Sequence, residues 1–174
     1  MKRSNSTRHS TLYLCTAAAI AALYAVLTWL SASVGLASGP IQFRISEALC
    51  VFALYTPAAV PGLTVGCLAA NLFGGCAAYD ILAGTLATLA GALGVRALRR
   101  LPKKLTVLTP LPYFAANTLV IPFVLRFVYG AEEALPLLFL FVGAGEFVCA
   151  WLGGLLLGAA VRKTHLDVLL TKNQ

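Results

Sequence analysis

Long runs of apolar residues, separated by short polar stretches, make up most of the chain. A helix needs roughly 20 residues to cross the hydrocarbon of a bilayer. Runs of about that length occur at about 11–34, 80–98, 106–129 and 136–161. The hydrophobic pattern therefore predicts an all-α integral membrane protein.

The apolar stretch 45–73 differs from these runs because Pro57 and Pro61 interrupt it. Proline removes a backbone donor and disfavours helix at the residue before it. The stretch thus predicts two shorter helices, at about 45–56 and 60–73. Neither is comfortably long enough to span alone, so we expect tilting or shielding by other helices. With the longer runs, they predict a compact six-helix transmembrane bundle.

Composition supports this fold class. Hydrophobic residues make up 60% of the 174 residues and charged residues 11%, whereas soluble domains carry about 25% charged residues. We expect one membrane domain at 11–163, between cytoplasmic tails at 1–10 and 164–174.

The fifth helix, at about 106–129, contains Pro110, Pro112 and Pro122, which predict kinks in it.

The basic residues gather in three places: 2–8, 96–104 and 162–172. A bundle of six helices puts these segments on one side, and the positive-inside rule makes that side cytoplasmic. Both termini are then cytoplasmic, and most acids lie on the other side. The net charge of +7 follows from this topology, so no nucleic-acid partner is predicted.

Ionisable and amide side chains at membrane depth are costly and indicate function. Most of them lie near the outer ends of helices, but Glu146 lies roughly 15 Å along the last helix at about 1.5 Å per residue. Asn117 lies at a similar depth in the fifth helix. Together they predict a polar cup that opens outward. Its candidate binding residues are Glu47, Glu146, Asp80, Asn71, Asn117 and Arg44.

Each candidate also has a structural interpretation. Glu47 follows Arg44 by three residues at a helix start, so the two can pair. Asp80 can cap the fourth helix, and Asn71 can bond a helix end. Tyr79 and Phe43 either stack on a flat ligand or anchor the protein at the membrane interface.

The first helix also carries a stripe of small residues at Ala17, Ala18, Ala21, Ala22 and Ala25. Small faces let membrane helices approach closely. The stripe either packs within this chain or docks a separate membrane subunit.

No motif for chemistry is evident. The sequence has no GxxxxGK[ST] nucleotide loop, no HExxH and no GxSxG, and the five cysteines have no metal-ligand spacing. We therefore expect no enzyme activity, no metal and no cofactor, and an energy source outside this chain.

Several segments together resemble the QueT family. They are RISEAL at 44–49, TPAAVPGLTVGCLAANLFGG at 56–75 with Asp80 following, GTLATL at 84–89, NTLVIP at 117–122 and GAGEFVCAWLGG at 143–154. That family comprises predicted queuosine-precursor substrate-binding subunits (S-components) of energy-coupling factor (ECF) transporters. The resemblance implies a six-helix bundle that binds substrate in an outward cavity.

The resemblance also implies partners and cargo. S-components associate with a transmembrane coupling subunit and two cytoplasmic ATPase subunits, and small residues on the first helix are the usual docking surface. The implied cargo is a 7-deazaguanine: queuine, preQ1 or preQ0. Glu47 and Glu146 are expected to bind the purine edge and the cationic amine, in either order. The alternatives are an S-component for another vitamin-like solute, or a membrane scaffold without a ligand.

Overall fold

The computed structural model describes residues 2–36 and 42–172, and these residues form helices and connecting turns without a strand. The elements are α1 (Lys2–Ser33), η1 (Ile45–Val51), α2 (Phe52–Tyr55), α3 (Ala59–Phe73), α4 (Ala78–Ala97), η2 (Leu98–Arg100), η3 (Lys103–Leu108), α5 (Leu111–Phe127), α6 (Leu135–Glu146), η4 (Phe147–Gly153), α7 (Gly154–Lys163) and α8 (Leu166–Lys172).

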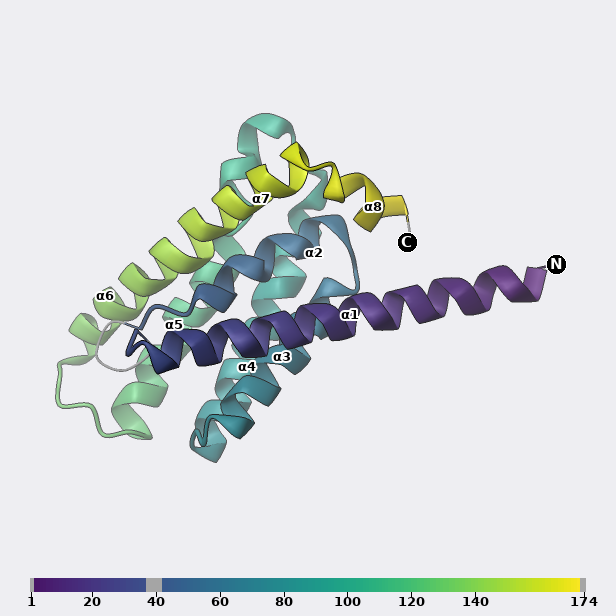
Figure 1. Cartoon of the computed structure of the whole chain (residues 1–174). Coiled ribbons are helices and arrows are strands. Elements are labelled where there is room, and N and C mark those ends of the chain that lie inside the picture. The colour runs from purple at the N-terminus through teal and green to yellow at the C-terminus, as the bar shows by residue number, and fades with distance from the viewer. Residues whose placement is uncertain (1, 37–41, 173–174) are drawn as a thin grey trace.

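The helices form a bundle in which sequence neighbours tend to lie side by side. Helix α3 packs on α1 and α4, and α4 packs in turn on α5. The segment η1 lies against α1, η4 and α7, which brings the start and the end of the chain together around it. The N-terminal part of α1 projects beyond the other helices (Figure 1).

Four helical segments of the described residues are long and apolar enough to cross a membrane: His9–Ser33, Ala78–Arg100, Lys104–Phe127 and Leu135–Lys163. Two further apolar helices, Ile45–Tyr55 and Ala59–Phe73, are shorter. The all-helical membrane fold is therefore confirmed, and so is the break at the prolines. The count of six spanning helices stays a prediction.

The elements differ from the predicted ones in three places. Helix α1 begins at Lys2 because the polar N-terminal residues contain no proline or glycine that would end a helix. Helix α8 lies in the predicted C-terminal tail. In α5, only Pro122 is internal. Pro112 lies in the first turn, where proline is tolerated.

Close packing depends on small residues where α3 crosses α1. A Cβ atom on Gly62 would lie 2.8 Å from the carbonyl oxygen of Ala17, and one on Gly66 would lie 2.7 Å from Cβ of Tyr24. Neither position can hold a side chain without moving α1. This contact fixes the face of α1 that points into the bundle.

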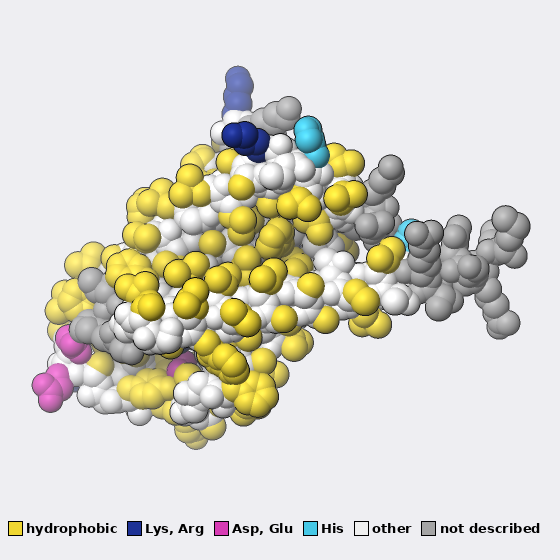
Figure 2. Space-filling model, in the orientation of Figure 1, with side chains coloured by type: hydrophobic (Ala, Val, Ile, Leu, Met, Phe, Trp, Pro, Cys, Tyr) yellow, Lys and Arg dark blue, Asp and Glu magenta, His cyan; other side chains and the backbone are white. Residues whose placement is uncertain are grey.

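The outer surface is largely apolar. Leu14, Leu82, Leu140 and Leu156 are between 60% and 73% exposed, which water would not favour but lipid would. Figure 2 shows apolar side chains over the flank, Lys and Arg gathered at one end and Asp and Glu towards the opposite end. This charge separation fits a protein that lies across a membrane.

Candidate binding site

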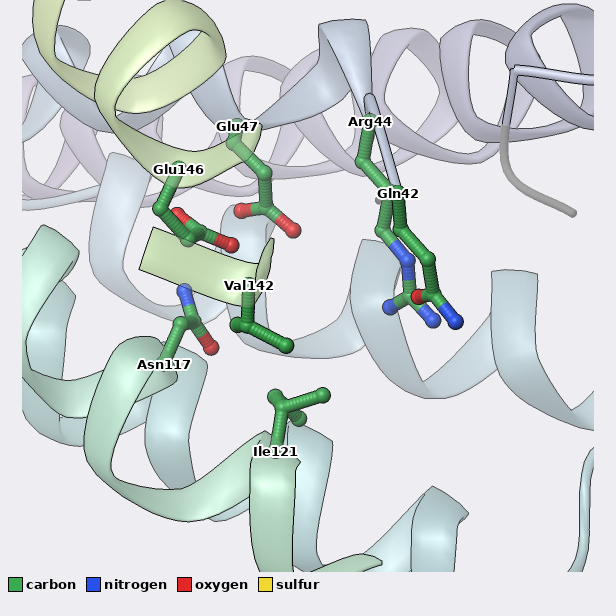
Figure 3. A pocket seen from close by; sticks show the side chains of 7 residues that line it. All are labelled: Gln42, Arg44, Glu47, Asn117, Ile121, Val142 and Glu146. Carbon is green, nitrogen blue, oxygen red and sulfur yellow. The ribbon is translucent and has the colours of Figure 1, made fainter. Parts of the chain in front are cut away.

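A small polar pocket lies inside the bundle, where η1 meets α5 and α6. Its free volume is about 20 Å³, which is room for about one water molecule. The lining residues are Gln42, Arg44, Glu47, Asn117, Ile121, Val142 and Glu146, and they are shown in Figure 3. The pocket therefore brings together four of the residues predicted as candidates.

Glu47 is held in place by helix α1. It is 2% exposed, and the hydroxyl of Tyr24 donates to its Oε1 at 2.8 Å. Its other oxygen, Oε2, is buried and has no hydrogen-bond partner in the described part of the chain. The protein thus fixes one carboxylate oxygen of Glu47 and leaves the other without a full hydrogen bond.

Glu146 ends α6, immediately before the π-helical segment η4. Such widened turns are frequent at functional sites. Its Oε2 and Nδ2 of Asn117 are both buried without a hydrogen-bond partner among the described residues. Figure 3 shows the Asn117 amide pointing towards Glu146. The pocket therefore offers a donor as well as acceptors.

Tyr113 of α5 adds a further unpaired group beside this cluster. It is fully buried and interacts electrostatically with Glu47, and its hydroxyl has no hydrogen-bond partner within the described residues. Buried polar groups are almost always paired. Each acid interacts with a neighbouring donor, Glu47 with Tyr113 and Glu146 with Asn117, but neither pair has the geometry of a full hydrogen bond. The cluster therefore has polar capacity that a ligand or water can use.

Arg44 is the cationic side chain that lines the pocket. Figure 3 shows its guanidinium beside the Gln42 side chain, to one side of both carboxylates. The segment that carries them packs tightly on α6: a Cβ atom on Gly145 would clash with the Gln42 carbonyl oxygen. Gly145 therefore allows Gln42 and Arg44 to reach the pocket.

Helix α1 is tied to η1 by polar contacts on successive turns. Besides the Tyr24 contact, Oγ1 of Thr28 lies 2.8 Å from Oγ of Ser46. The backbone N–H of Ile45 donates to Oγ of Ser31 at 3.1 Å. The hydrophobic pattern does not predict these contacts. The signal for them in the sequence is the helical spacing of Tyr24, Thr28 and Ser31 along an otherwise apolar stretch.

Asp80, a predicted site residue, does not line this pocket. The hydroxyl of Tyr129 donates to Oδ2 of Asp80 at 2.8 Å and accepts from the N–H of Ala77 at 3.1 Å. Desolvation by burial raises the pKa of Tyr129 to about 12, and the bond to Asp80 acts in the same direction. The phenol therefore stays protonated at neutral pH and joins the start of α4 to the end of α5.

Three other predicted residues also lie outside the pocket lining. Asn71 is buried between α3 and α4, where its Nδ2 lies 3.6 Å from Sγ of Cys67. Tyr79 is 73% exposed on the apolar flank. Phe43 lies between two lining residues, and its N–H donates to the carbonyl of Leu36.

The small-residue stripe of α1 divides between two faces. Ala17 and Ala21 contact the glycines of α3, and Ala25 packs against the hydrophobic core. Ala18 and Ala22 are exposed. The internal-packing interpretation thus holds for part of the stripe, and docking remains a prediction for the exposed part.

These features define a multi-pass membrane protein with a polar pocket enclosed among its helices. The family described as QueT transporter matches residues 14–163, so the chain belongs to the QueT transporter family. The predicted membership is confirmed, and the chain is a member of a transporter family.

Among characterised proteins, the chain is similar to the "Queuosine precursor transporter QueT" of Lactococcus lactis subsp. cremoris (strain MG1363). The two are 35% identical over 82 residues, which cover 47% of this chain and 48% of that relative. The match thus spans about half the length of each. No solved structure matches the chain.

Proposed function

We propose that this chain is the substrate-binding membrane subunit of an ATP-driven ECF importer and captures a queuosine precursor: queuine, preQ1 or preQ0. The observation that carries the proposal is the cluster of unpaired polar atoms on Glu47, Asn117 and Glu146 around one pocket. The name of the L. lactis relative supports the class of cargo.

The chemistry of a 7-deazaguanine suits this cluster. Its guanine-like edge presents ring N–H and amino donors side by side, which one carboxylate accepts in a bidentate manner. The amine of preQ1 or queuine is cationic and is neutralised by a second carboxylate. Glu47 and Glu146 fill these roles between them. Asn117 and Arg44 are placed to bind the remaining polar edge.

The pocket must expand to accept such a base, because its present volume is about 20 Å³. The Gln42 carbonyl packs on Gly145, so outward movement of this segment opens the space between η1 and α6. In the proposed cycle, the described form corresponds to an unloaded, closed pocket. When the base binds, its contacts with the pocket replace the contact between the Gln42 carbonyl and Gly145.

Transport needs an energy source, and the sequence contains no nucleotide-binding loop. In the proposed complex, a transmembrane coupling subunit and two cytoplasmic ATPase subunits supply it. The exposed Ala18 and Ala22 are the part of α1 free to contact the coupling subunit. Both termini and the basic end face the cytoplasm, so that the pocket loads from outside.

The decisive experiment is uptake of labelled queuine or preQ1 in cells that make this chain, with and without a coupling module. Uptake that requires the module and is lost in the Glu47→Gln/Glu146→Gln variant is the expected result. No uptake in the complete system refutes the cargo, and uptake without any ATPase refutes the coupling. Competition by riboflavin or biotin would indicate a different vitamin-like solute.

A further inference from the structure

A second cavity lies at the basic end of the bundle, separate from the pocket around Glu47. It has a volume of about 260 Å³ and lies between the end of α2, the segments η2 and η3, and helices α7 and α8. Arg99, Arg162 and Thr106 line it together with Leu98 and Leu101. It is therefore much larger than the outer pocket and has two cations in its wall.

Within the part of the chain that the structure describes, each of the two arginines donates from one nitrogen to a protein oxygen. Arg99 donates from Nη1 to the carbonyl of Arg96 at 3.4 Å, and Arg162 donates from Nη1 to the hydroxyl of Tyr55 at 3.2 Å. Each guanidinium has further N–H donors. No Asp or Glu lines the cavity among the described residues, so the field inside it favours an anion.

The surroundings of the cavity are those of a membrane interface. Leu105 on η3 and Leu166 on α8 are 42% and 44% exposed, and Val168 on α8 is 51% exposed. The apolar lining at Leu98 and Leu101 continues this surface into the cavity. A ligand that fits has an anionic head for the arginines and an apolar part for the leucines.

We propose that this cavity binds a phosphate group, supplied by the headgroup of an anionic phospholipid in the leaflet at the basic end. Guanidinium groups bind phosphate oxygens through paired N–H donors. Basic pockets between membrane helices on the cytoplasmic side are suited to anionic headgroups. The site is distinct from the pocket around Glu47, because the two share no lining residue.

The test uses the full chain in nanodiscs of neutral phosphatidylcholine, with phosphatidylglycerol titrated in and bound lipid counted by native mass spectrometry. The variant Arg99→Gln/Arg162→Gln removes both lining cations. The matched control Arg100→Gln/Lys163→Gln removes the same charge from adjacent residues that do not line the cavity. We expect the first variant to weaken phosphatidylglycerol binding about tenfold, and the control to weaken it about twofold or less.

Equal losses in the two variants, or no preference for phosphatidylglycerol in the unmodified chain, would overturn the proposal. Inorganic phosphate is the second probe. If it protects the unmodified chain from thermal unfolding, but not the lining variant, the phosphate site stands and its source is the free ion. Because Arg162 also bonds Tyr55, the charge-preserving variant Arg99→Lys/Arg162→Lys tests for misfolding. It should unfold at the unmodified temperature and keep most of its lipid preference.

Discussion

Glu47 and Asp80 are both acidic, both buried and both outside the basic end, yet the structure treats them differently. Glu47 keeps one buried oxygen without a partner beside a pocket. Asp80 receives the hydroxyl of Tyr129, which also caps the N–H of Ala77. Burial alone therefore does not mark a candidate binding acid. The two acids differ in that Glu47 lines a pocket and has a buried oxygen without a partner among the described residues, whereas Asp80 has neither feature.

The largest expected effect comes from removing the charge of the pocket acids. Glu47→Gln or Glu146→Gln should each weaken preQ1 binding by about 10-fold to 150-fold, since a hydrogen bond to a charged group contributes about 1.5–3 kcal/mol. Calorimetry on purified protein measures this. Asp80→Asn is the control, and an equal loss there would erase the contrast between the two acids.

The next effect concerns the approach of the Gln42 segment to α6. Gly145→Ala places a methyl group against the Gln42 carbonyl and should destabilise the fold by about 1–3 kcal/mol, with weaker preQ1 binding. Gly143→Ala is the control, since its Cβ meets only Cγ2 of Thr118 at 3.4 Å. Thermal unfolding and binding are measured for both. Matching results would show that Gly145 has no special role.

A smaller effect is expected from the phenol that holds Glu47. Tyr24→Phe removes the donor to Oε1 but keeps the packing against α3. We expect preQ1 binding to weaken about twofold to tenfold, in line with about 0.5–1.5 kcal/mol for a typical hydrogen bond. The exposed Tyr79 provides the control variant Tyr79→Phe. Unchanged affinity in Tyr24→Phe would mean that α1 does not position the carboxylate.

The smallest effect on binding is expected from Tyr129, which holds Asp80. Tyr129→Phe removes the hydrogen bonds to Asp80 and Ala77 and should lower the free energy of unfolding by about 1–2 kcal/mol. Affinity for preQ1 should not change. A loss of affinity that exceeds the loss of stability would assign this region to the binding site.

Much of the fold followed from the sequence because lipid imposes simple rules on it. Apolar length located the long helices, and Pro57 with Pro61 located the break between α2 and α3. The cost of polar groups among apolar helices pointed to six candidates, of which the structure brings Glu47, Glu146, Asn117 and Arg44 into one pocket.

The side-chain pairings that the sequence did not predict depend on which face each helix turns into the bundle. In the sequence, Tyr24 cannot be told apart from a tyrosine that only packs in the core or at the membrane interface. The contact of α1 with α3 is what points its side chain towards Glu47. Gln42 reaches the pocket because Gly145 lets the backbone lie close. Asp80 is a buried acid like Glu47, but Tyr129, distant in sequence, donates a hydrogen bond to it. Such pairings arise from tertiary packing, which hydrophobic patterning does not encode.

The narrowness of the pocket around Glu47 has a consequence for proton movement. Space for about one water molecule does not hold a file of waters between Glu47 and Glu146. Protons cross a bilayer along continuous chains of water and ionisable groups. In its closed form this pocket adds no stretch of water to such a chain, even though it places two acids inside the bundle.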